Sequence, residues 1–462
     1  MFPSKILHQI ERFSSKKKSL SILLGLIFVP VVANALPRSE VVVGYELEFT
    51  DNLFATEENK ERSTAQAVTG ELSLEDFEGS LLYETDLDFR YLSYLDSDVD
   101  DRLQATGSVN TEWFFIPKQL SWVFDNAIVE QRVDPLSGSS PLNIEWVNSM
   151  STGPVWILRP SERNIIELTA RYERVDYEES IEDESESVLG NIEWVRIISP
   201  LLDIGLGAQA SERQDFGVDE FTEEKQSAYA FFDNEFKNAQ LYLAGGATRI
   251  TVDDFEDEFA TVDGRWTHSW TPTLEFQLLA ERAVVSGSDL LLDSEDFLEG
   301  AEPGAEPNPQ IPVFEDFESI LLFIETLDGR SVIRDSKSAS LTKTQGLWST
   351  TLTAYEIDSE QINPLNVEIV ENYRGISLAT GFSFSTRFNA GARISAERRE
   401  STELGIQRNI DEHRLLFEST YYLWSNLAVN GALQFERFQG DTLETDNINI
   451  MTLLFGVEYQ LR

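Results

Sequence analysis

A strict alternation of apolar and polar residues recurs along this chain and constrains its fold more than any other feature. In the stretch LLYETDLDFRY (81–91), the odd positions are mainly apolar and the charged residues occupy even positions. A period of two predicts β-strands with one apolar and one polar face. Because charged side chains do not pack into a dry core without partners, we expect the polar faces to meet water in a lumen. The stretches NIIELTARYERVDY (164–177) and LEFQLLAER (274–282) have the same alternation. Among the charged residues of the three polar faces, the candidates for lining the lumen are Glu84, Asp86, Asp88, Arg90, Glu167, Arg171, Glu275 and Glu281.

The connections between the alternating stretches are short and long in turn. The short ones contain proline, glycine or asparagine, as at Pro117 and Gly346, and longer acidic segments lie between them. Short turns at one end and long loops at the other are typical of outer-membrane β-barrels. Of the 9 tryptophans, all but Trp146 lie within a few residues of a short turn. We interpret them as an aromatic girdle at one membrane interface.

We therefore expect an all-β fold, a single antiparallel transmembrane β-barrel of about 20 strands (roughly 18–22) with short periplasmic turns and long acidic extracellular loops. An even number of strands returns both ends of the barrel to the periplasmic side. A soluble sandwich or propeller is the alternative, but it explains neither the unequal connections nor the tryptophans. The expected strands cover residues 41–51, 63–75, 79–95, 101–115, 119–131, 143–157, 163–177, 185–198, 201–213, 224–237, 239–251, 256–270, 273–286, 330–344, 347–358, 367–384, 387–399, 411–424, 427–439 and 447–461.

Residues 1–35 have the pattern of a signal peptide. Basic residues come first, an apolar run from Leu20 to Val32 follows, and Ala33-x-Ala35 supplies the small residues of a cleavage site. We expect cleavage after Ala35, which leaves residues 36–462 as the barrel. An uncleaved membrane anchor is the alternative, but the run is shorter than the ~20 apolar residues that a spanning helix needs.

The charge balance is strongly acidic, with a formal net charge of -45 for the whole chain. The expected leader carries five basic residues and one acidic residue, so its removal leaves a charge near -49. Such a charge disfavours nucleic acid as a partner. Apolar residues make up 41% and aromatic residues 11% of the chain, too much for a disordered protein. The chain has no cysteine, which excludes disulfides and thiolate chemistry.

The stretch GYELEFTDNLFAT (44–56), followed by amphipathic hairpins, resembles outer-membrane β-barrel proteins associated with exopolysaccharide and exosortase systems, which are close to the β-barrel porin 2 group. The resemblance rests on residues 50–54 and on the regular succession of hairpins along the whole mature chain. The stretch YERVDY at 172–177 is a weaker match. It implies a protein of the Gram-negative outer membrane that the barrel-assembly machinery inserts and that works with polysaccharide export components. Such barrels commonly end on an aromatic residue, whereas this chain ends on Arg462.

Pairs of an acidic residue and an arginine recur near the predicted outer ends of strands. Where the arginine has the parity of the apolar face, we expect it at the outer rim in contact with lipid, where a guanidinium group suits the phosphates of lipopolysaccharide. Ordinary ion pairs between neighbouring strands are the alternative, and only that alternative fits Arg213, which has the opposite parity. The four rim candidates are Arg174, Arg282, Arg398 and Arg437.

Two acidic loops are further candidates. Residues 287–329 contain 12 acidic residues and no basic one, and we expect this loop to fold over or into the barrel mouth as a lid or constriction. A solvated tip and an additional strand pair are the alternatives. In DSDVDD, Asp96, Asp98 and Asp100 stand at alternate positions and offer oxygen ligands for loosely bound Ca²⁺. The loop lacks the glycine turn and distal glutamate of an EF-hand, so a solvated acidic tip is the alternative there.

The mature chain offers no catalytic constellation. Its two histidines, His268 beside a short turn and His413 near an outer strand end, are predicted at opposite ends of the barrel. Spacing assembles no Ser/His/acid set, phosphate loop or metal-ligand cluster. We expect no enzyme activity and no cofactor beyond the calcium just mentioned.

A polar, acid-rich lumen of this size predicts an aqueous channel unless loops plug it. Two functions remain open. The resemblance implies a component of exopolysaccharide secretion or assembly, which is the function we expect first. A general diffusion porin that prefers cations and passes small hydrophilic solutes is the alternative, and a non-conducting structural barrel is a third. An acidic lumen repels polyanions, so a transported polysaccharide should be neutral or weakly charged. Tyr94 and Trp146, near the outer ends of their strands, are the candidate sugar contacts.

Overall fold

The computed structural model describes residues 38–56, 60–97, 99–133, 140–178, 184–216, 222–252, 255–285, 331–362, 369–403, 406–440 and 447–461. The expected signal peptide and the loop 287–329 lie outside the described residues. Among the described residues, no helix is long and apolar enough to span a membrane.

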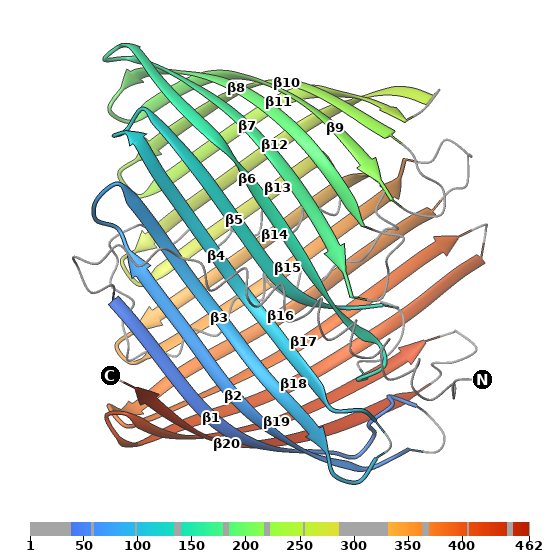
Figure 1. Cartoon of the computed structure of the whole chain (residues 1–462). Coiled ribbons are helices and arrows are strands. Elements are labelled where there is room, and N and C mark those ends of the chain that lie inside the picture. Colours follow the sequence, from blue (N-terminus) through green and yellow to red (C-terminus); the bar gives the residue numbers. More distant parts are fainter. Residues whose placement is uncertain are drawn as a thin grey trace, which may run out of the picture. The chain divides into compact units, whose positions relative to one another are not determined.

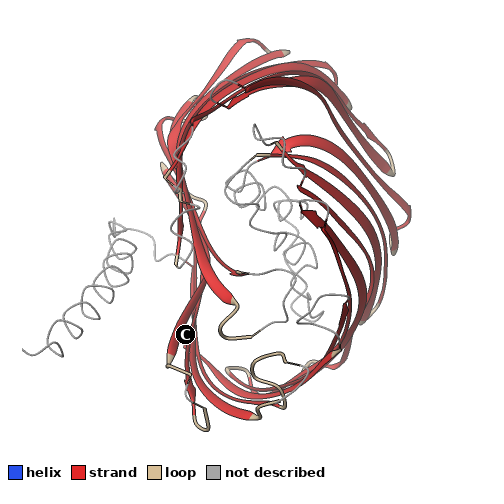
Figure 2. Ribbon diagram, turned by 90° about the vertical axis from the view of Figure 1, so that its right-hand side faces the viewer, coloured by secondary structure: helices blue, strands red, loops and turns tan. Residues whose placement is uncertain are grey.

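In the described part of the chain, twenty β-strands form one sheet that closes on itself (Figures 1 and 2). Each strand pairs with the next in sequence, and β1 pairs antiparallel with β20 from Val41↔Leu461 to Thr50↔Thr452. This confirms the prediction of an antiparallel barrel of about 20 strands. The strands are β1 Arg38–Thr50, β2 Ser63–Asp76, β3 Leu81–Tyr94, β4 Arg102–Ile116, β5 Leu120–Arg132, β6 Ile144–Ser161, β7 Asn164–Tyr177, β8 Ser185–Ser199, β9 Leu202–Asp215, β10 Thr222–Phe236, β11 Ala239–Val252, β12 Phe255–Thr271, β13 Leu274–Val285, β14 Val332–Gln345, β15 Trp348–Gln361, β16 Ile369–Ser385, β17 Phe388–Glu403, β18 Ile406–Trp424, β19 Leu427–Gly440 and β20 Ile448–Leu461.

The barrel has two different ends, which we call the short-turn end and the long-loop end. At the short-turn end, tight turns join β4 to β5 and β14 to β15, and Lys118 and Gly346 adopt positive φ angles of 58° and 63° there. Apolar side chains of the outer face, such as Leu206, Val262 and Ile376, are about half exposed. In a membrane these faces meet lipid, while the closed ring pairs the strand backbones. The outward tryptophans of the short-turn end are Trp113, Trp122, Trp156, Trp266, Trp270, Trp348 and Trp424.

One hairpin leaves the wall at the long-loop end. The register of β4 with β5 begins at Gly107↔Ile128 and continues toward the short turn. Beyond that point, residues 102–106 of β4 pair with β3, and residues 129–132 of β5 pair with β6. Gly107 has φ +126°, and a Cβ atom there would lie 2.0 Å from the Asp86 carbonyl oxygen, so the wall bends where only glycine fits. We call residues 129–132 and 144–148 the β5–β6 tip.

Candidate functional site

The inner face of the wall is the candidate functional site, and β1 shows how it is recognised. Val43, Tyr45 and Phe49 of β1 are more than 40% exposed on the outer face, so Glu46 and Glu48 point into the lumen. Arg90 of β3 donates hydrogen bonds to both carboxylates, at 2.9 Å and 2.7 Å. The structure therefore places Arg90 on the inner face, and with it the even positions of β3.

The other predicted lumen residues also lie on inner faces. Glu84, Asp86 and Asp88 are exposed on β3, on the same parity as Arg90. Arg171 of β7 lies 3.2 Å from the carboxylate of Asp125 on β5. The remaining three accept hydrogen bonds from hydroxyl groups: Glu167 from Thr169, Glu275 from Ser269 and Glu281 from Ser336.

A second group of charged residues, which the sequence reasoning missed, crosses the lumen near the long-loop end. Arg132 belongs to the β5–β6 tip, yet its guanidinium lies 3.6 Å from the carboxylate of Glu412 on β18. It also lies 5.5 Å from the ring centroid of Phe438 on β19. In the ring of strands, β5 is separated from β18 by β1 and its neighbours on either side, so this contact bridges the lumen.

Glu412 is the centre of this group, which we call the bridge network. Its carboxylate lies 2.7 Å from Arg414 and 3.3 Å from Arg399, in addition to Arg132. Arg414 also pairs with Glu436 at 2.9 Å, and Arg399 with Glu397. Glu412 is only 5% exposed. Three guanidinium groups around one buried carboxylate hold the β5–β6 tip against the opposite wall.

Contacts of β4 independently support the displacement of the tip. Arg102, at the long-loop end of β4, lies 3.2 Å from the carboxylate of Glu178, just after β7, and donates a hydrogen bond to the carbonyl oxygen of Pro141. Arg102 thus reaches past β5 and β6, because their ends no longer stand between β4 and β7 in the wall. The signal in the sequence was the loss of alternation at 127–132 (AIVEQR), where three apolar residues precede three polar ones.

The TDN motif, which carried the family resemblance, anchors the loop between β1 and β2. Asn52 is 1% exposed, its amide donates to the carbonyl oxygens of Thr56 and Asn449, and it accepts a hydrogen bond from the Thr56 N–H. Asp51 accepts a hydrogen bond from the Met451 N–H at 2.7 Å. These bonds tie residues 51–56 to β20, where the barrel closes.

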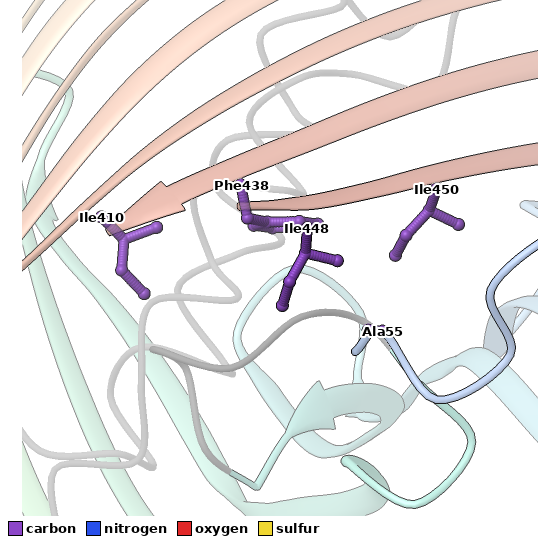
Figure 3. Close-up of a cluster of buried hydrophobic side chains, with 5 residues drawn as sticks. All are labelled: Ala55, Ile410, Phe438, Ile448 and Ile450. Carbon is purple, nitrogen blue, oxygen red and sulfur yellow. The ribbon is translucent and has the colours of Figure 1, made fainter. Parts of the chain in front are cut away.

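The anchored loop presents Ala55 to an apolar cluster on the inner face of β18, β19 and β20 (Figure 3). The cluster consists of Ala55, Ile410, Phe438, Ile448 and Ile450, all less than 8% exposed. Because Phe438 also lies beneath Arg132, the apolar cluster and the bridge network are continuous. Among the described residues, the lumen is thus narrowed at this end by residues 51–56 and by the β5–β6 tip.

The four rim arginines occupy the outer face, where they contact nearby acidic or amide side chains. Arg174 lies 2.7 Å from Asp176 and 3.0 Å from Glu186. These contacts match the ion-pair alternative, and a lipopolysaccharide contact stays a prediction. Of the other rim arginines, Arg282 pairs with Asp335, Arg398 with Glu400, and Arg437 donates to the Gln439 side chain. Arg213, which fitted only the ion-pair alternative, pairs with Asp215 on the inner face.

The remaining candidates are not brought together. Tyr94 packs against Ala65, Ala67 and Leu92 on the inner face, whereas Trp146 belongs to the β5–β6 tip. Asp96 and Asp100 are exposed, Asp98 lies outside the described residues, and the described part of the chain holds no group of three ligating residues arranged for a metal ion. His268 lies between Trp266 and Trp270 at the short-turn end, and His413 is exposed near the long-loop end.

No protein-family model matches the sequence, and no curated protein matches it either. Solved structures do. The siderophore receptor PirA from Acinetobacter baumannii has a TM-score of 0.51 and 8% identity, over 93% of this chain and 81% of that chain. The siderophore receptor PirA from Pseudomonas aeruginosa has a TM-score of 0.46 and 10% identity, over 93% of this chain and 81% of that chain. OccAB3 from Acinetobacter baumannii has a TM-score of 0.40 and 10% identity, over 92% of this chain and 100% of that chain. The likeness shows the fold alone, that of an outer-membrane β-barrel.

Proposed function

We propose that this barrel is a channel in the outer membrane of a Gram-negative bacterium that passes neutral and cationic hydrophilic solutes. The observation that carries the proposal is the acidic inner face of the short-turn half, where Glu84, Asp86 and Asp88 are exposed. The inner-face arginines nearby, Arg90 and Arg171, already bind carboxylates and so neutralise little of this charge. Carboxylates attract cations and repel anions within about a Debye length, ~10 Å at 0.1 M salt.

The bridge network is the proposed constriction of this channel. Its three arginines and three glutamates nearly cancel in charge, so it restricts the size of a solute more than the sign of its charge. Selectivity for charge then comes from the wall of the short-turn half, and selectivity for size from the β5–β6 tip. A solute meets the two filters one after the other.

Ion selectivity in planar bilayers tests the proposal. In a potassium chloride gradient, the reversal potential of the purified protein should lie closer to the equilibrium potential of potassium than to that of chloride. The preference for potassium should be stronger at low salt, since the Debye length grows to roughly 30 Å at 0.01 M. The triple change Glu84→Gln, Asp86→Asn and Asp88→Asn should weaken this preference. Selectivity for chloride in the unchanged protein would overturn the proposal.

A matched control uses acids of the outer face. Glu256 and Glu258 lie on β12 beside Arg249, on the face that carries Val262 toward lipid. The changes Glu256→Gln and Glu258→Gln remove two negative charges without touching the lumen, so the reversal potential should stay where it was. An equal loss of selectivity in this control would mean that overall charge, rather than the inner face, sets the preference.

Transit of a secreted polysaccharide is the second candidate function. It is supported by the resemblance of residues 44–56 to barrels of exopolysaccharide systems and by aromatic rings on the inner face, described below. Deletion of the gene separates the two candidates. Loss of surface polymer with unchanged permeability to small solutes supports polysaccharide transit, and the reverse result supports the diffusion channel.

A further inference from the structure

Three aromatic rings form a continuous surface on the inner wall between β10 and β11. The ring centroids of Phe231 and Tyr242 are 5.9 Å apart, with their planes 29° from parallel, and those of Tyr229 and Phe231 are 6.4 Å apart. All three side chains are partly buried. Their parity is inward, because the alternate positions on the neighbouring strands, Leu206 and Leu243, are about half exposed on the outer face.

Two of the rings lie flat along the wall, over glycines of β9. Phe231 pairs with Gly205 and Tyr229 pairs with Gly207 in the register of β9 and β10. A Cβ atom on Gly205 would lie 2.2 Å from the Phe231 ring, and one on Gly207 would lie 2.1 Å from the Tyr229 ring. The rings therefore occupy the space that side chains of β9 would fill. One face of each ring covers a glycine, and the other face is turned toward the lumen.

Polar groups surround this surface. The Tyr229 hydroxyl donates a hydrogen bond to Glu193 at 2.8 Å, which fixes the ring against the wall. The Arg265 guanidinium lies 5.7 Å from the ring centroid of Tyr242 and 3.3 Å from the Asp263 carboxylate. Donors and acceptors thus border the rings of Tyr229 and Phe231, and the Arg265 guanidinium lies over part of the Tyr242 ring.

We infer that Tyr229, Phe231 and Tyr242 form a saccharide-binding surface inside the lumen, which takes neutral pyranose chains. A pyranose ring has an apolar face of C–H groups, which stack on the electron-rich face of an aromatic ring, and equatorial hydroxyls that reach polar groups at its edge. The carboxylates nearby repel an acidic sugar, so the chain should be uncharged. The inference rests on the proposed channel function, because the ligand must enter the lumen.

Block of the ion current by a neutral glucose oligomer, maltohexaose, tests the inference. The unchanged protein should show concentration-dependent, transient block. The double change Phe231→Leu and Tyr242→Leu removes two stacking contacts and should weaken block about tenfold, since the loss of each contact should weaken affinity roughly threefold. Tyr242→Phe keeps the ring and should keep the block.

The control variant is Phe384→Leu. Phe384 is 60% exposed on the outer face and its ring lies 4.4 Å from that of Phe382, so this change removes an aromatic contact outside the lumen. Block should be unchanged. Equal block in the double variant and the unchanged protein, with conductance retained, would overturn the saccharide surface and leave the channel intact.

If the purified protein forms no channel, the proposed function fails and the surface is tested by calorimetry in detergent with the same oligomer. Binding that is lost in the double variant and retained in Tyr242→Phe supports the inference. The absence of binding by the unchanged protein overturns it.

Discussion

In the short-turn half of the barrel, inner-face residues such as Asp86 and Glu275 are exposed, whereas in the long-loop half Glu145, Val147 and Phe438 are almost completely buried. The same wall therefore has two environments. In the first half the alternation of the sequence separates lipid from water. In the second half the inner face packs against other parts of the protein, and it carries both apolar clusters and buried charges.

The comparison shows what alternation can and cannot specify. A strand in the wall has one face in lipid and one in the lumen, so parity determines the environment of each residue. In the β5–β6 tip both faces lie inside the barrel. Arg132 has the parity of Trp122, which faces lipid, and yet it binds Glu412 in the lumen. Parity loses its meaning where a strand leaves the wall.

The largest effect should come from removing the carboxylate at the centre of the bridge network. Glu412→Ala leaves Arg132, Arg399 and Arg414 without their shared partner, and breaking a buried pair on one side costs about 3–5 kcal/mol. Glu84→Ala, in the exposed half, should change the free energy of unfolding by less than about 0.5 kcal/mol. Thermal unfolding followed by the heat-dependent gel mobility of the barrel measures both. Equal stability of the two variants would contradict the division into halves.

A change in conductance should follow from releasing the β5–β6 tip. Arg132→Ala removes the contacts of the tip with Glu412 and Phe438, so we expect a larger single-channel conductance and more frequent fluctuation between levels. Arg282→Ala is the matched control, because Arg282 pairs with Asp335 on the outer face. Unchanged conductance in Arg132→Ala would show that the tip does not set the width of the pore.

A smaller effect is expected at the anchored loop between β1 and β2. Asn52→Ala removes buried hydrogen bonds to Thr56 and Asn449, each worth about 1 kcal/mol. Because residues 51–56 follow a strand and do not bridge the lumen, the barrel should stay folded while these residues become sensitive to added protease. Resistance to cleavage equal to that of the unchanged protein would mean that other contacts hold the loop.

The short-turn half was predictable from the sequence for a physical reason. Most of its side chains face either lipid or water, and residue type reflects the difference, as at Leu278 on the outer face and Glu275 on the inner face. The number of strands and most of their bounds followed, although β6 and β18 extend further than predicted, to Ser161 and from Ile406. The tight turns and the tryptophans add independent information about the same end.

The bridge network was not predictable in this way, because its contacts join strands far apart in sequence. The sequence shows Arg398 and Arg399 side by side, and alternation assigns one to each face. It does not show that Arg399 meets a carboxylate from β18 which also binds a residue of β5. Which residues contact each other here depends on how far the β5–β6 tip extends into the lumen. That distance is determined by the closed barrel as a whole and cannot be read from the local sequence.

Chemical cross-linking between the tip and the opposite wall tests the central claim most directly. The chain has no cysteine, so Val133→Cys, next to Arg132, and Gly440→Cys, across from Ile410 of β18, introduce the only pair for a flexible bis-maleimide reagent in whole cells while Arg132 and Glu412 stay in place. Arg398→Cys with Asp411→Cys, a registered pair on β17 and β18, is the positive control. We predict that both pairs cross-link and change the gel mobility of the unfolded chain. Cross-linking of the control pair with none between residues 133 and 440 would contradict a tip that crosses the lumen.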